Sequence, residues 1–169
     1  MGTNGSTMLE PLRQGLPPLD PAAVSNAASC ALPSRHEAVR QARHFTQRTL
    51  EQWDADECFD DVCLVVSELV TNALRHALPP DTARTPEQRP AAVRLHLLRW
   101  TERLVCAVRD PSMDSPVARA SDDFSAESGR GLFLVDSFSD SWGWHPLAGP
   151  LDGKVVWALF RLPRPVPVD

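Results

Sequence analysis

A carboxylate and a carboxamide stand four residues apart in this chain, at Glu68 and Asn72, within a run that predicts a helix. Four helical residues separate two side chains by about 40° around the axis and roughly 6 Å along it, so both share one face. Such oxygen ligands suit Mg²⁺, which usually keeps several waters while it bridges substrate phosphates. His76 continues the same row. Taken alone, however, the pair is better explained as a solvated polar stripe on an amphipathic helix.

A second candidate is the glycine-rich run Ser128-Gly129-Arg130-Gly131-Leu132, which follows an irregular stretch and opens a predicted helix. Glycines let the backbone approach a ligand closely. The first free amides of a helix point toward bound anions, and the helix dipole favours negative charge there. The run therefore has the chemistry of a phosphate-binding helix start, although most isolated Gly-x-Gly pairs are ordinary turns.

The third candidate is Asp110, an acid at the end of a strand-like apolar run. A carboxylate buried at a strand end can accept a hydrogen bond from an exocyclic amino group such as that of adenine, which would help to exclude guanine. An aspartate that caps a turn before Pro111 explains the same pattern, and for this residue alone the turn is the favoured interpretation.

The elements that must position these residues follow from hydrophobic periodicity and from turn signals. Helices come first and strands dominate afterwards, with one helix inserted, which indicates an α+β fold rather than alternating βαβ units. Ser34 and Glu37 form a plausible capping box for the first helix, and Pro79 and Pro80 stop the second. We predict a strand at 27–32, helices at 34–53, 56–77 and 132–138, strands at 92–98 and 104–108, and a final strand pair within 142–162.

Composition restricts the class of protein. The chain has 169 residues, 43% of them hydrophobic and 23% charged, which suits one globular domain at 25–162 between tails at 1–24 and 163–169. A formal charge of -5 argues against a surface built to hold nucleic acid or an anionic membrane. Neither a membrane-spanning run nor a signal-peptide pattern is present, so we expect a cytoplasmic protein.

The cysteine and tryptophan residues have structural explanations. No cysteine pair has metal-ligand spacing, and we expect reduced, mostly buried thiols. The tryptophans are more typical of core or sheet-face anchors than of a ligand cage. These residues are Cys30, Cys58, Cys63 and Cys106, and Trp53, Trp100, Trp142, Trp144 and Trp157.

In this order, the three candidate runs resemble the N, G1 and G2 boxes of the histidine-kinase-like ATPase (GHKL) superfamily, in its subgroup of anti-sigma regulatory factors and serine-protein kinases. The likeness covers about residues 26–162. The matching runs are Ser67-Glu68-Leu69-Val70-Thr71-Asn72-Ala73-Leu74-Arg75-His76-Ala77, Val108-x-Asp110, Gly129-Arg130-Gly131-Leu132-x-Leu134-Val135, Ser141-Trp142-Gly143-Trp144 and Gly153-Lys154-Val155-Val156-Trp157.

The resemblance implies a Bergerat-type fold, a two-layer sandwich of a mixed, mostly antiparallel β-sheet covered on one face by helices. It implies ATP and Mg²⁺ as ligands and residues 111–128 as a lid. By the resemblance, Glu68 is the general base for an attacking hydroxyl, Asn72 holds the metal, and Asp110 binds the adenine amino group. Arg75 lies near a phosphate, and the phosphates are wrapped by Gly129, Arg130, Gly131 and Leu132.

The sequence departs from the family pattern at two places. The G1 box usually reads Asp-x-Gly, and Ser112 replaces that glycine. The tight glycine turn under adenine is thereby lost, and the start of the lid is expected to be stiffer. A hydroxyl residue commonly precedes the last strand, where Val155 and Val156 stand in this chain, which removes one possible water-mediated contact with adenine.

The resemblance leaves three functions to separate. The first is an anti-sigma factor with serine/threonine-protein kinase activity toward an antagonist protein, with a sigma factor as a further partner and a homodimer as a possible assembly. The second is a non-catalytic module in which ATP orders the lid and so controls a protein partner. The third is an α+β protein without a nucleotide site, which requires all three candidate runs to be coincidences.

Overall fold

The structure of the chain is a computed structural model that describes residues 24–33, 36–76, 93–100, 102–112, 116, 128–147 and 153–164. Of the two predicted tails, only Val24, Pro163 and Arg164 fall inside these ranges. Ser34, the prolines at 79 and 80, and most of the expected lid at 111–128 lie outside them.

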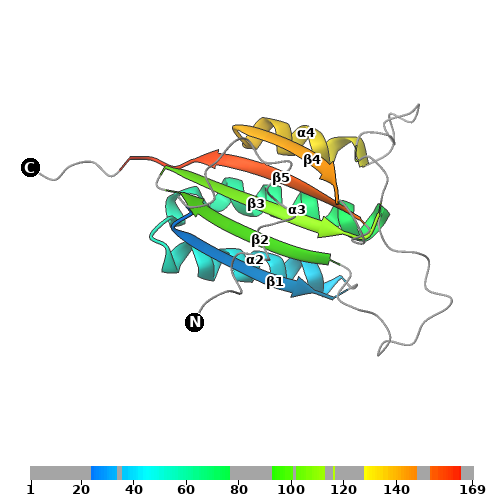
Figure 1. The fold of residues 1–169 in the computed structure, drawn as a ribbon, viewed down its shortest axis with the longest axis horizontal. Coiled ribbons are helices and arrows are strands. Elements are labelled where there is room, and N and C mark those ends of the chain that lie inside the picture. Colours follow the sequence, from blue (N-terminus) through cyan, green and yellow to red (C-terminus); the bar gives the residue numbers. More distant parts are fainter. Residues whose placement is uncertain are drawn as a thin grey trace, which may run out of the picture.

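Five strands form one open sheet in the order β1-β2-β3-β5-β4 (Figure 1). They are β1 (Asn26–Leu32), β2 (Val93–Trp100), β3 (Arg103–Asp110), β4 (Ser141–Pro146) and β5 (Lys154–Arg161). Each predicted strand is present, with predicted ends that differ from the observed ones by at most two residues. All four pairings are antiparallel, so the expected mixed character of the sheet was wrong for the described strands. For β2 and β3 this follows from the connectivity, because a tight turn joins them.

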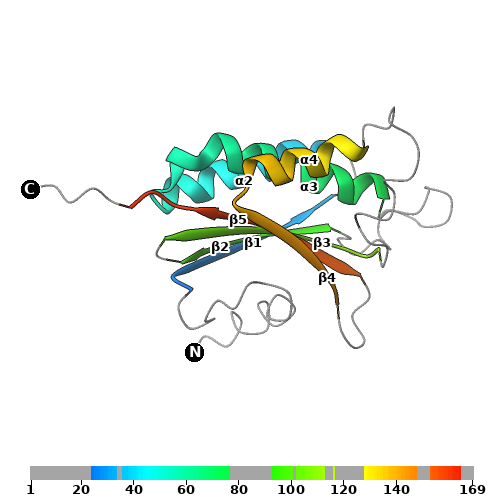
Figure 2. The same cartoon turned by 90° about the horizontal axis from the view of Figure 1, so that it is seen from above.

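The helices all lie on one face of this sheet, as Figure 2 shows, which confirms the two-layer α+β arrangement. They are α2 (Glu37–Gln52), η3 (Asp56–Cys58), α3 (Phe59–His76) and α4 (Ser128–Phe138). Acidic residues stand in the first turns of η3 and α3, where they interact favourably with the helix dipole. In the described part of the chain, no helix is both long and apolar enough to cross a membrane.

The start of α2 differs from its prediction. The helix begins at Glu37 with His36 in the N-cap position, and His36 makes no side-chain capping hydrogen bond. Ser34 lies outside the described residues, so the capping box between Ser34 and Glu37 stays a prediction. Burial of the face that carries Ala38, Ala42 and Leu50 holds the helix in place.

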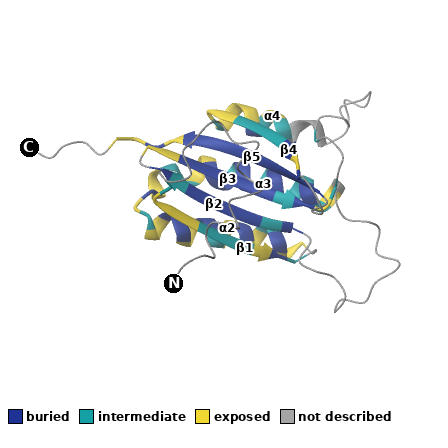
Figure 3. Cartoon of the chain, viewed as in Figure 1, coloured by how far each residue is buried: buried dark blue, intermediate teal, exposed yellow. Residues whose placement is uncertain are grey.

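The main core lies between the helices and the sheet. Successive strand residues point to opposite faces, and in β2 Leu95 and Leu97 point toward the helices. β3 and β5 are buried along almost their whole length (Figure 3). Trp142 and Trp144 pack against this core, which confirms that these two residues are structural anchors.

The opposite face of the sheet is also apolar, although no described helix lies on it (Figure 2). Trp100 and Trp157 belong to a buried cluster there, and Val24, just before β1, packs against the same cluster. The remaining members are Leu98, Val105, Ala107, Leu147, Val155 and Leu159. His96 alternates with Leu95 and Leu97 and therefore faces this side of the sheet. Only 8% of its surface is exposed.

The environment of His96 predicts a loss of stability in acid. Burial, together with the charges of Arg94 and Arg109, lowers the pKa of His96 from 6.5 to about 4. Between these two pH values, the unfolded chain therefore binds a proton at His96 that the folded chain does not bind. His96 leaves the free energy of unfolding unchanged above pH 6.5. As the pH falls from 6.5 toward 4, His96 lowers this free energy by at most about 1.4 kcal/mol per pH unit.

Urea denaturation of the wild type and of His96→Gln at pH 7.5 and pH 5 measures this effect. The variant should show a smaller decrease in unfolding free energy on acidification than the wild type. His44→Gln, which changes an exposed histidine, is the control. Equal decreases in the wild type and in His96→Gln would contradict the assignment.

Candidate functional site

Helix α3 lies between the other elements that carry the candidate runs, since it packs against β3 and against α4. Its apolar face is fully buried at Val62, Val65, Val66 and Val70. Glu68 and Asn72 are half-buried, and Arg75, one turn further on, is exposed. Their row is therefore not a fully solvated stripe. His76 is the last residue of α3.

Asp110 ends β3 on the side of the sheet that faces the helices. Val108, two residues earlier, belongs to the main core on that same side. Only 3% of Asp110 is exposed, so its carboxylate is buried. The backbone N–H of Ser112 donates a hydrogen bond to Asp110 Oδ1 at 2.8 Å. Asp110 thus caps the turn after the strand, as the turn interpretation of the sequence expects. Its carboxylate is also a buried hydrogen-bond acceptor in the layer between the sheet and the helices.

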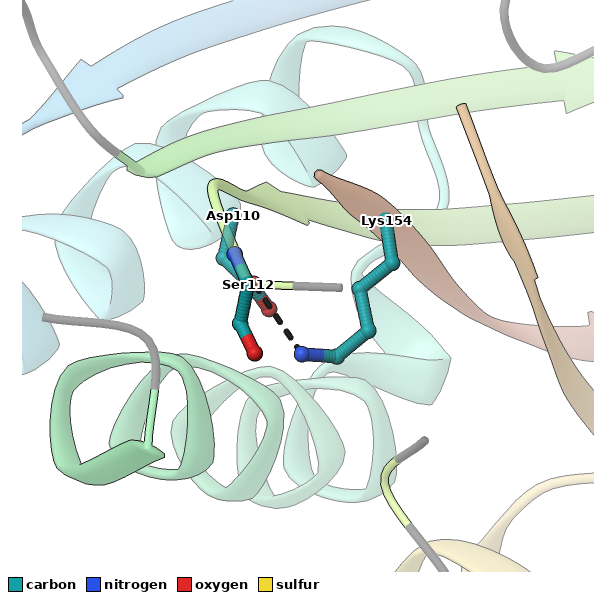
Figure 4. A network of polar contacts seen from close by, with 3 residues as sticks. All are labelled: Asp110, Ser112 and Lys154. Carbon is teal, nitrogen blue, oxygen red and sulfur yellow. Dashed lines mark hydrogen bonds and ion pairs between the residues drawn. The ribbon is translucent and has the colours of Figure 1, made fainter. Parts of the chain in front are cut away.

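Lys154 is the second partner of this carboxylate, and sequence reasoning gave it no role. Its ammonium Nζ donates to Asp110 Oδ1 at 3.0 Å, and Lys154 is only 5% exposed (Figure 4). The two residues are register partners at the ends of β3 and β5. They are 44 positions apart, and only the pairing of these two strands makes them neighbours. A sequence signal was present, since Lys154 is the only lysine in the chain.

Gly153 allows the start of β5 to approach the end of β3. Its φ is +120°, a value that side-chain-bearing residues rarely adopt. A Cβ at this position would overlap the carbonyl oxygen of Asp110 and would lie 3.1 Å from the Cα of Pro111. The glycine is therefore required by close backbone contact as well as by its own dihedral angle, and it fixes where Lys154 enters the sheet.

The turn after Asp110 accommodates its serine. Among the residues that the structure describes, Asp54 is the one non-glycine residue with a positive φ, so Ser112 does not need the left-handed conformation that favours glycine. The second departure from the family pattern is the pair Val155 and Val156, which stands in place of a hydroxyl residue. Val156 faces the main core and Val155 the opposite cluster, so between these two positions only Val156 points toward the helices.

The glycine-rich run forms the first turn of α4, because the helix begins at Ser128 rather than near 132. The first amides of a helix have no partner within it, so the backbone of Ser128, Gly129 and Arg130 keeps the donors expected of an anion-binding turn. Gly131 follows, and Leu132 is half-buried. Val135 anchors the helix in the main core, against α3.

The fold thus brings together the three elements that carry the candidate runs. α3 contacts β3, whose last residue is Asp110, and it also contacts α4, whose first turn holds the glycines. The individual roles of Glu68, Asn72 and Arg75 toward a ligand remain predictions. The position of Asp110, buried and facing the helix layer, is directly visible.

Replacing Gly153 tests the close approach of β3 and β5. We expect Gly153→Ala to lower the unfolding free energy by at least about 2 kcal/mol, because the added methyl group meets backbone and the positive φ becomes strained. Gly143→Ala is the comparison, since its Cβ would meet the ring of Trp157, at 2.7 Å, rather than backbone. Urea denaturation measures both variants. If Gly153→Ala were as stable as the wild type, the requirement for glycine at this close approach would be contradicted.

Comparison with solved structures supports the fold. A structure of the RsbU and RsbW domains of a Mycobacterium tuberculosis protein matches 83% of this chain with a TM-score of 0.58 and 17% identity, and this chain spans 34% of that protein. The SiaB–SiaC complex of Pseudomonas aeruginosa provides a second match, with a TM-score of 0.54 and 14% identity over 92% of this chain and 95% of that one. A search of curated protein sequences gave no significant match.

Comparison with protein families identifies the chain. The family model of the histidine kinase-like ATPase domain matches residues 32–158, from the end of β1 to within β5. The matched range includes α3, Asp110, the first turn of α4 and Lys154, and it accounts for most of the chain. A family model that covers most of the chain shows its family, and the chain therefore belongs to the histidine kinase-like ATPase domain family.

Proposed function

We propose that this chain binds ATP with Mg²⁺ and uses the bound nucleotide to control a protein partner. The observation that carries the proposal is the buried carboxylate of Asp110 on the helix-facing side of the sheet, next to a helix that also packs against the glycine-rich start of α4. Membership of an ATPase domain family supports the same ligand. A buried acceptor, amide oxygens and free helix amides are the donor and acceptor set that a purine nucleotide requires.

Each candidate residue has a defined role in this proposal. Asp110 accepts a hydrogen bond from the adenine amino group, and Asn72 provides a side-chain oxygen for Mg²⁺. Arg75 supplies positive charge near the phosphates. When bound, the magnesium nucleotide supplies a phosphoryl group for transfer. The backbone of the first turns of α4 surrounds the phosphates through Gly129, Arg130, Gly131 and Leu132.

We further propose that the chain is an anti-sigma factor with serine/threonine-protein kinase activity toward an antagonist protein. Glu68 lies one turn before Asn72 on α3, where a carboxylate can accept the proton of an attacking Ser or Thr hydroxyl. Phosphoryl transfer asks the protein mainly for positioning and charge, so a small domain suffices. A sigma factor and the antagonist are the expected partners, and a homodimer is a possible assembly. One structural relative, SiaB, was solved in a complex with SiaC, which supports a protein partner for this fold.

Titration calorimetry tests nucleotide binding. The wild type should bind ATP in the presence of Mg²⁺. Asp110→Asn should weaken binding by at least about tenfold, because it replaces a charged acceptor. Asn72→Asp should change the dependence on Mg²⁺, because it alters the proposed metal ligand. Asp60→Asn, an exposed residue in the first turn of α3, is the matched control and should bind like the wild type. No heat with ATP and Mg²⁺ would refute the proposal.

A non-catalytic role remains the second candidate, favoured by the departure at Ser112 from the family's glycine. Incubation with labelled ATP and candidate antagonist proteins separates the two. If the chain is a kinase, Glu68→Gln should lower phosphoryl transfer at least about hundredfold while ATP binding persists. Glu57→Gln, an exposed acid in η3, is the control. Partner control that survives Glu68→Gln and is lost in Asp110→Asn would identify a binding switch instead.

A further inference from the structure

We propose that Lys154 determines the base specificity of the site by keeping Asp110 an acceptor-only carboxylate, so that adenine is bound and guanine is rejected. The inference rests on the proposed nucleotide site and deepens it. Lys154 acts through Asp110 and is therefore a positioning residue. Its place beside Asp110 is set by the pairing of β3 with β5 and by the close backbone approach at Gly153.

The ion pair is buried on both sides. Lys154 is 5% and Asp110 3% exposed, and Nζ lies 3.0 Å from Oδ1. Removing either charge from such a pair leaves the other without compensation in a medium of low polarity, which is strongly unfavourable. The pair therefore holds the carboxylate in its ionised form. A carboxylate accepts about four hydrogen bonds, so the ion pair is compatible with acceptance of a base amino group.

Lysine at this position contrasts with the rest of the chain. Apart from five histidines, the other sixteen basic residues are all arginine. A guanidinium is a planar fork that favours two-pronged contacts, whereas an ammonium is a compact point charge with three donors. Lys154 and the Ser112 amide donate to the same oxygen, Oδ1 of Asp110. The compact ammonium of a lysine suits this arrangement, in which both donors are directed at a single carboxylate oxygen.

The protonation state of Asp110 decides which base fits. An ionised carboxylate can only accept hydrogen bonds, and the amino group of adenine is a donor. Guanine presents a carbonyl oxygen at the same ring position, and two acceptors face each other unfavourably. Without the ammonium, burial favours the neutral carboxylic acid, which carries an O–H donor as well as an acceptor. That acid can donate to the carbonyl of guanine, so discrimination between the two bases falls.

Calorimetric affinities for ATP and GTP test this inference in four proteins. The wild type should prefer ATP by at least about hundredfold. Lys154→Met should reduce this preference by at least about tenfold, and Lys154→Arg, which keeps the charge, should retain most of it. Arg161→Met is the matched control, because it removes one positive charge from the exposed far end of β5 and should leave the preference unchanged. Circular dichroism verifies that each variant is folded.

A second measurement uses the folded wild type alone. Because Lys154 is the only lysine, protein produced with ¹³Cε-lysine gives a single lysine NMR signal. Saturation with ATP should shift this signal, since the base amino group joins the carboxylate that Lys154 contacts. No shift at saturation would overturn the inference even if Lys154→Met does not fold.

The two levels of the proposal fail in different ways. A wild type that binds neither ATP nor GTP overturns the proposed function and this inference together. A wild type that binds ATP but does not distinguish it from GTP, or a preference that Lys154→Met leaves intact, overturns only the role of Lys154.

Discussion

The approach of the end of β3 to the start of β5 is the constraint on which the candidate site depends. Gly153 permits that approach because it has no Cβ to meet the carbonyl of Asp110. The pairing then places Lys154 against Asp110 in a buried ion pair. Burial of a carboxylate without such a partner would strongly destabilise the folded state. The pair therefore makes it possible for an acidic group to be buried between the sheet and the helices.

The helix layer supplies the other half of the site. α3 is anchored by a valine-rich face, and the polar row of Glu68 and Asn72 runs along its flank at intermediate burial. α4 packs on α3 and brings the glycine-rich turn to the same layer. In the proposed function, the acceptor at the end of β3 binds the base, and the side-chain oxygens of α3 and the amides of the first turn of α4 bind the metal and the phosphates. In the proposed function, ATP is held jointly by both layers.

The two faces of the sheet have different properties. The helix-facing side holds the main core and the Asp110–Lys154 pair. The other side carries Trp100 and Trp157 in a second apolar cluster, with His96 at 8% exposure among basic neighbours. Acid sensitivity and nucleotide recognition are thus expected to arise on opposite faces. Stability measurements on His96 variants can consequently be interpreted separately from effects on the candidate site.

The sequence by itself determined the element order, the one-sided amphipathic patterns and the family, because hydrophobic periodicity and motif spacing are local properties. Asp110 and the glycine-rich turn were identified for the same reason. Only the tertiary structure decided that β3 pairs with β5 and that all described pairings are antiparallel. Lys154 was missed because its partner is distant in sequence, and no local pattern encodes a contact created by strand pairing.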